Sequence, residues 1–166
     1  AEANTAAEPH ASFGLAKIGG YSVVLADPTG KILDKIVLPE VPTNVSYGRT
    51  MGREGFFYYD VPSPGAQNGA TGFLGYAEAP QLTVAQGKYL AGIAVGVTIP
   101  EDTTVYYSLD GSVPGPYNSA SKPYNGETIE VNETTVLRAR AFPVDPMYRE
   151  STVTTGTYLI DARHKV

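Results

Sequence analysis

Acidic side chains in the C-terminal half of the sequence are the residues best suited to acid–base chemistry. Glycosidic bonds are hydrolysed by two carboxyl groups, one acting as the acid and the other as base or nucleophile. The candidates for such a pair are Glu101, Asp102, Asp110, Glu127, Glu130 and Glu133. They fall at expected turns or at outward positions of expected strands. Solvated surface positions therefore explain these acids more simply than a catalytic pair does.

Other catalytic chemistries lack the residues that they need. Nucleophilic catalysis requires a Ser or Cys beside an oriented base, but the sequence has no Cys, no G-x-S-x-G motif and only two histidines, His10 and His164. A zinc site needs about four ligands, which two terminal histidines do not supply. The sequence also lacks a glycine loop of the phosphate-binding type. We therefore expect no catalytic residue, no metal site, no cofactor and no enzymatic activity.

Asp110 is followed by Gly111 and Ser112, and this triplet permits two interpretations. A carboxylate in such a loop could bind calcium, but calcium takes 6 to 8 oxygen ligands and no acidic cluster of EF-hand spacing surrounds Asp110. An Asp before a Gly at the end of a strand more often caps its own turn. We favour the turn cap.

Tyrosines form a second set of candidates, because sugar rings pack on flat aromatic faces. The sequence has 12 Tyr and no Trp. Tyr106, Tyr117 and Tyr124 flank the 110–112 turn, and they are our candidates for contact with a glycan or a partner protein. Tyr is also a common strand residue, so packing in the core or on a strand surface is the interpretation we favour.

The charge balance argues against some partners. The formal net charge is −5, which opposes contact with nucleic acid phosphates and with anionic lipid headgroups. Arg49 and Arg53 make the most basic spot of the first half, and we expect them to pair with Asp or Glu. No apolar run approaches the roughly 20 residues of a membrane-spanning helix. We therefore predict no nucleic acid partner and no membrane insertion.

Composition and pattern predict an all-β protein. The 166 residues include 18 Gly and 13 Pro, which suits short strands joined by many turns. In the first half, residues 21–25 and 31–38 read as a hairpin around the turn at 27–30, and a third apolar run covers 56–59.

The second half alternates more regularly, with apolar side chains at every other position. This period of two predicts strands that each bury one face, and the set predicts a β-sandwich. The inward residues are expected to be Ile93, Val95, Val97 and Ile99, then Val105, Tyr107 and Leu109, then Ile129 and Val131, then Leu137, Ala139 and Ala141. The last strand is predicted from Ser151 to Tyr158.

The expected organisation is two small β modules. Residues 1–8 form a loose lead-in, 9–75 the first module, 76–160 the second and 161–166 a linker to a following domain. The boundary is set by the Pro- and Gly-rich stretch that ends at residue 75.

The second module resembles the chitobiase/β-hexosaminidase C-terminal-like domain. The resemblance is carried by Val105–Pro114, which includes Asp110, Gly111 and Ser112 as a structural motif, and by Thr135–Ala141. It covers about residues 78–160. The resemblance implies an accessory Ig-like or fibronectin-like β-sandwich that is an appendage of the enzymes it occurs in, not their catalytic barrel.

The first module resembles the C-terminal part of a lamin-tail-type domain, another Ig-like sandwich. The resemblance rests on several short motifs in order: residues 10–15, 19–25 and 30–34, then Ser46, Gly48 and Arg49, then Pro64, Gly65 and Asn68. Such domains usually begin with further strands, so the first module is expected to be incomplete.

This pairing of modules resembles the accessory region of bacterial surface proteins that also carry a spore-coat CotH-type kinase-like domain. It implies an extracellular or cell-surface location, although the N-terminus lacks the layout of a signal peptide. We expect a non-catalytic spacer or protein-interaction unit whose partners are the other domains of the parent protein. The alternative is a module that binds carbohydrate or cell wall through exposed tyrosines.

An incomplete first module has a consequence for assembly. Two or three strands cannot close a sandwich, so the apolar face of Tyr21, Val23 and Leu25 needs cover. We expect either an intrachain interface across residues 62–80 or a homodimer through the first module, and we favour the dimer.

Overall fold

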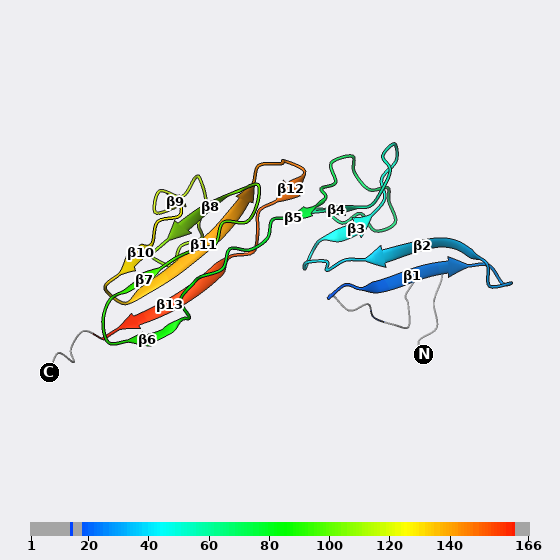
Figure 1. The fold of residues 1–166 in the computed structure, drawn as a ribbon. Coiled ribbons are helices and arrows are strands. Elements are labelled where there is room, and N and C mark those ends of the chain that lie inside the picture. The colour runs from blue at the N-terminus through cyan, green and yellow to red at the C-terminus, as the bar shows by residue number, and fades with distance from the viewer. Residues whose placement is uncertain (1–13, 15–17, 162–166) are drawn as a thin grey trace. The chain divides into compact units, whose positions relative to one another are not determined.

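The protein folds entirely from β-strands in the part of the chain that the computed structural model describes, which is residue 14 and residues 18–161 (Figure 1). The chain divides into two compact units, Ala1–Gly72 and Phe73–Val166. The prediction of an all-β fold is confirmed. No helix among the described residues is long and apolar enough to cross a membrane. The expected lead-in at 1–8, His10 and His164 lie outside the described residues.

The described residues of the first unit form four strands in two antiparallel pairs. They are β1 (Tyr21–Ala26) with β2 (Ile32–Leu38), and β3 (Ser46–Gly48) with β4 (Phe57–Tyr59). The predicted hairpin is confirmed, and Asp27 closes its turn. One carboxylate oxygen of Asp27 accepts hydrogen bonds from the backbone N–H groups of Thr29 at 2.9 Å and Lys31 at 3.0 Å.

Burial in the first unit is concentrated in β4. Phe57, Tyr58 and Tyr59 are all buried, and the ring of Tyr47 on β3 lies 4.8 Å from that of Tyr58. The β1–β2 hairpin is different, because every residue of β1 is exposed. The first unit therefore combines a small aromatic core with an exposed two-stranded ribbon.

The second unit contains nine strands between residues 73 and 161, the part of it that the structure describes. They are β5 (Gly75–Tyr76), β6 (Gly87–Tyr89), β7 (Ile93–Val95), β8 (Thr103–Ser108), β9 (Lys122–Tyr124), β10 (Ile129–Val131), β11 (Thr135–Pro143), β12 (Tyr148–Arg149) and β13 (Thr154–Ile160). Five of them form a sheet in the order β6-β13-β11-β8-β9. β10 pairs with β7, and β5 pairs in parallel with β12.

The core of the second unit lies between the five-stranded sheet and the β10–β7 pair. β7, β10 and the segment after β7 contribute Val95, Val97, Ile129 and Val131, and the larger sheet contributes Val105, Tyr124, Leu137, Ala139, Ala141 and Tyr158. Side chains from two sheets thus share one core, as in a β-sandwich. The predicted alternation is confirmed at Val95, Val97 and Val105 and along β10 and β11.

The prediction is wrong at two strand ends. Ile99 is 47% exposed and Leu109 is 37% exposed. Ile99 lies beyond Val97, whose bridge to Leu82 is the last β pairing of that segment, and Leu109 lies beyond β8, which ends at Ser108. Outside a pleated strand, the alternation no longer directs a side chain toward the core.

The start of the last strand also differs from expectation. β13 begins at Thr154 rather than Ser151, because Ser151 is buried and its hydroxyl accepts a hydrogen bond from the Ala141 N–H at 3.0 Å. The division between the two compact units falls after Gly72, and the Leu74 N–H donates to the Met147 carbonyl of the second unit at 2.7 Å. Asp161 also remains bonded to the second unit, because its N–H donates to the Tyr89 carbonyl.

Candidate functional site

The turn after β8 is capped by Asp110. The Ser112 N–H donates to the Asp110 carboxylate at 2.9 Å, and Gly111 between them has a φ of 77°. The turn-cap interpretation of Asp110 is thereby confirmed. Hydrogen bonds from Ser112 lower the pKa of Asp110 below its ordinary value. A general acid needs the opposite shift.

Neighbouring strands hold the same turn from several directions. Arg138 on β11 donates to the Gly111 carbonyl at 2.9 Å, and the Ser108 hydroxyl donates to the Ser112 carbonyl at 2.7 Å. The Asn118 side-chain amide donates to the Ser112 hydroxyl at 2.9 Å. A shallow cavity of about 250 Å³ lies beside the turn, lined in part by Lys122. These hydrogen bonds fix the conformation of the turn, so its residues have a structural role.

The three candidate tyrosines do not form one surface. Tyr124 is 7% exposed, and its hydroxyl oxygen accepts a hydrogen bond from the Val97 N–H at 3.0 Å. Tyr106 is half-buried, with its ring edge-on to Phe142 at 5.5 Å. Tyr117 is fully exposed. Tyr124 thus belongs to the core of the sandwich, and Tyr117 is the candidate that offers an open ring face.

The six acidic candidates are all exposed, as expected for solvated positions. Two of them, Glu101 and Asp102, take part in a larger feature that the sequence did not reveal. A cavity of about 350 Å³ lies in the second unit, between β5, β12 and the loops that precede β8 and follow β11. Its lining includes Tyr76, Glu78, Glu101, Asp102, Asp145 and Tyr148.

This cavity combines aromatic rings with carboxylates. Tyr76 is 36% exposed and Tyr148 is 40% exposed, so both rings are accessible. Carboxylate oxygens accept hydrogen bonds from hydroxyl groups, and ring faces cover apolar faces of a ligand. No group of three acids or histidines among the described residues is placed to hold a metal ion. The cavity is therefore suited to a neutral, hydroxyl-rich or cationic ligand.

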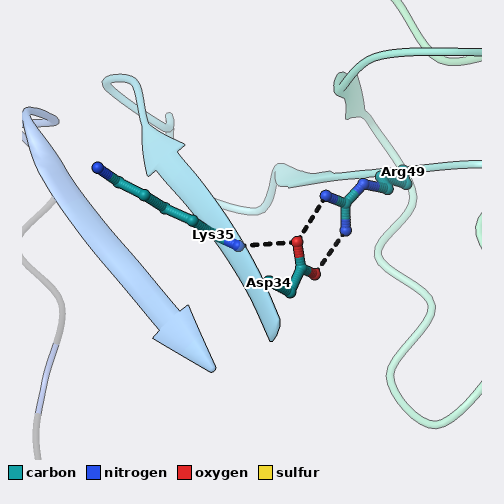
Figure 2. A network of polar contacts seen from close by, with 3 residues as sticks. All are labelled: Asp34, Lys35 and Arg49. Carbon is teal, nitrogen blue, oxygen red and sulfur yellow. Dashed lines mark hydrogen bonds and ion pairs between the residues drawn. The ribbon is translucent and has the colours of Figure 1, made fainter. Parts of the chain in front are cut away.

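In the first unit, Arg49 forms a bidentate ion pair with Asp34 of β2 (Figure 2). Its guanidinium donates to the two carboxylate oxygens at 2.7 and 2.8 Å, and the Lys35 N–H donates to one of them at 2.8 Å. The Arg49 hydrogen bonds lower the pKa of Asp34 to about 2. The prediction that Arg49 pairs with an acid is confirmed. Arg53 instead donates to the Ala70 and Gly72 carbonyls.

Asn68 joins the two motifs that we singled out in the first unit. Its side-chain amide donates to the Arg49 carbonyl at 2.7 Å, and its side-chain oxygen accepts from the Ser63 hydroxyl at 2.8 Å. Gly48 makes room for this contact, since a Cβ there would lie 2.9 Å from the Asn68 side-chain nitrogen. Gly65, in the turn between Ser63 and Asn68, has a φ of 73°. The two motifs are therefore joined by the hydrogen bonds of the Asn68 side chain.

Comparison with known proteins bears on the second unit. Residues 84–155 match the chitobiase/beta-hexosaminidase C-terminal domain. The match runs from just before β6 into β13 and covers less than half of the chain, and it is to an accessory type of domain. No curated protein matches the chain, and no solved structure matches it. The predicted resemblance of the second module is confirmed, while the lamin-tail and CotH-type resemblances stay predictions.

Gly111 in the turn after β8 should not tolerate a β-branched residue. We expect Gly111→Val to lower the free energy of unfolding by more than about 1 kcal/mol, because φ near 77° disfavours a Cβ. Gly111→Asn is the matched control, since Asn adopts left-handed backbone more readily. Urea denaturation of the full chain measures both. Equal stability of the Val variant and the native chain would contradict the expectation.

We expect the pKa of Asp34 to lie well below the ordinary value of an Asp side chain. A lowered pKa in the folded state stabilises the fold above the ordinary value of 3.8, and this contribution is lost as pH falls through about 2. Carboxyl NMR should therefore find the Asp34 midpoint near 2 in the native chain. In Arg49→Met the midpoint should return toward 3.8, whereas Arg53→Met should leave it unchanged. A native midpoint near 3.8 would show that the pair does not persist in solution.

Proposed function

We propose that the chain is a non-catalytic accessory segment that acts as a spacer in a larger bacterial exported or cell-surface protein. Its support is the match of residues 84–155 to an accessory domain of glycoside hydrolases. The acids that might have served catalysis are exposed, and Asp110 is engaged as a turn cap. The bacterial, surface-exposed setting and the CotH-type association rest on the order of the two sequence resemblances.

The observation that carries the spacer proposal is where the chain enters and leaves the second unit. It enters beside β12, where β5 pairs with Tyr148 and Arg149. It leaves at Asp161, bonded to Tyr89 at the far end of β13 (Figure 1). The start of β13 lies on the entry side, since the Thr154 hydroxyl donates to the Pro80 carbonyl at 2.6 Å. The seven residues of β13 thus separate the two ends by roughly 20 Å.

The pairing of β6 with the last strand, β13, suits this role. β6 and β13 run parallel, with Tyr158, Leu159 and Ile160 opposite Gly87, Lys88 and Tyr89. A pull on the two ends of the unit draws these strands in opposite directions along their length. The ladder hydrogen bonds are then loaded together rather than one after another. Such a unit keeps its length under tension.

Single-molecule pulling through the termini of the full chain tests the spacer. The second unit should extend in one cooperative step, with a gain on the order of 300 Å for the residues between Phe73 and Asp161. Tyr158→Phe should lower the unfolding force, because it removes the hydrogen bond from β13 to the Val84 carbonyl. Tyr89→Phe is the control, since its hydroxyl bonds only within its own segment, to Ala85. Gradual extension without a force peak would contradict the proposal.

A second candidate function is contact with a polysaccharide, and the cavity at β5 and β12 favours it. Its two accessible tyrosine rings and its carboxylates are the groups by which proteins cover and hydrogen-bond a sugar ring. The fully exposed Tyr117 is the other open ring among our candidates. Tyr124 is excluded from this role by its burial.

Pull-down with insoluble chitin, cellulose and peptidoglycan tests the cavity. If it holds sugar, Tyr148→Ala should weaken binding at least about tenfold by removing a ring face. Tyr117→Ala is the control for an exposed tyrosine outside the cavity and should bind like the native chain. Binding that is absent in the native chain, or lost only with Tyr117→Ala, would exclude the cavity as a sugar site.

A further inference from the structure

The β1–β2 hairpin exposes apolar side chains on both of its faces. Side chains alternate between the two faces along a strand, so Tyr21, Val23 and Leu25 lie on one side, and they are 45%, 37% and 61% exposed. The opposite side carries Val24 and Val37, which are 46% and 58% exposed. A two-stranded ribbon is marginally stable in water, whereas three or more strands give independent stability. Among the described residues, no third strand pairs with this hairpin, and apolar side chains stay exposed on both of its faces.

The outer edge of β1 is the open side of this ribbon. Among the described residues, β1 pairs with β2 alone. Beyond β2, on the side away from β1, lies Arg49, which binds Asp34 (Figure 2). Natural proteins protect a free edge with charges, Pro or bulges. The sequence of β1, YSVVLA, has no charge and no Pro, and the one irregularity in its register falls at its last step, between Leu25 and Ala26.

We propose that β1 is a self-association edge, along which two copies of this chain pair antiparallel across a two-fold axis. The pairing would join the two hairpins into one four-stranded sheet. Each β1 would then have a neighbour on both edges, and its backbone N–H and C=O groups would be paired on both sides. This inference goes beyond the proposed spacer function, since it concerns the first unit.

The sequence of β1 is complementary to itself in this arrangement. A two-fold axis perpendicular to the sheet places a residue opposite its own copy and keeps equivalent faces on the same side. With the axis at Val24, Val23 faces Leu25 of the second copy. With the axis at Val23, Tyr21 faces Leu25 of the second copy. In both registers most opposed pairs are apolar, the one polar residue Ser22 facing Ala26 or Val24, and no like charges meet within β1, because Asp34 and Lys35 lie on β2.

Sedimentation of the full chain over a wide concentration range tests the proposal. We expect a monomer–dimer equilibrium for the native chain. Val24→Lys should weaken dimerisation at least tenfold, because it places two ammonium groups near the axis. Val144→Lys is the matched control, since Val144 is 74% exposed in the second unit and lies outside the proposed edge. A native chain that stays monomeric at every concentration would overturn the proposal, as would equal weakening by both variants.

Cysteine cross-linking gives a second test that does not depend on a destabilising charge. The sequence has no Cys, so a single introduced thiol reports only on its own position. Opposed residues of antiparallel strands have Cα atoms about 4.5 to 5.5 Å apart, which suits a disulfide. On oxidation, Val23→Cys or Val24→Cys should form a covalent dimer, and Tyr117→Cys should not. Failure of both β1 variants to cross-link, or equal cross-linking at Tyr117, would overturn the proposed edge.

Discussion

The second unit depends on how closely residues 80–89 pack against β13. Tyr158 of β13 is fully buried, and its hydroxyl donates to the Val84 carbonyl at 2.8 Å. Burial raises the pKa of Tyr158, so the hydroxyl keeps its proton and remains a donor. Gly156 opens the space for this segment, since a Cβ there would lie 2.6 Å from a methyl group of Leu82. Because Leu82 also bridges to Val97 beside the β10–β7 sheet, this packing joins the two sheets of the sandwich.

The first unit combines a small aromatic core with polar contacts that attach its loops and its hairpin. Its buried aromatic residues belong to β4, and the loops around them are tied by the Asn68 side chain. The hairpin is attached through the Asp34–Arg49 pair and through the Tyr58 hydroxyl, which donates to the Glu40 carbonyl at 3.1 Å. An ion pair whose side chains are about half exposed contributes little in water. The stability of this unit therefore rests mainly on β3, β4 and the loops that pack on them.

The sequence alone predicted the features that depend on patterns among residues close together in the chain. The period of two along β11 identified Leu137, Ala139 and Ala141 as core residues, and the Asp27 turn identified the hairpin. Tyr124 was not identified as a core residue, because β9 has only three residues and too short a pattern to fix a buried face. The cavity could not be predicted either. It depends on the parallel pairing of β5 with β12, which lie some 70 residues apart and carry no shared sequence signal.

The motifs of the first unit were predicted only in part from the sequence. Their order in the sequence suggested that residues 46–49 and 63–68 belong to one structure. It did not show which contacts join the two segments. The reason is steric and polar: Gly48 leaves space beside the strand end, and Asn68 fills it with an amide that bonds both the strand end and its own loop. A larger residue at position 48 would displace the amide and leave the Arg49 carbonyl without this donor. The pattern of Gly and Asn is therefore explained by this joint itself, whatever family the first unit belongs to.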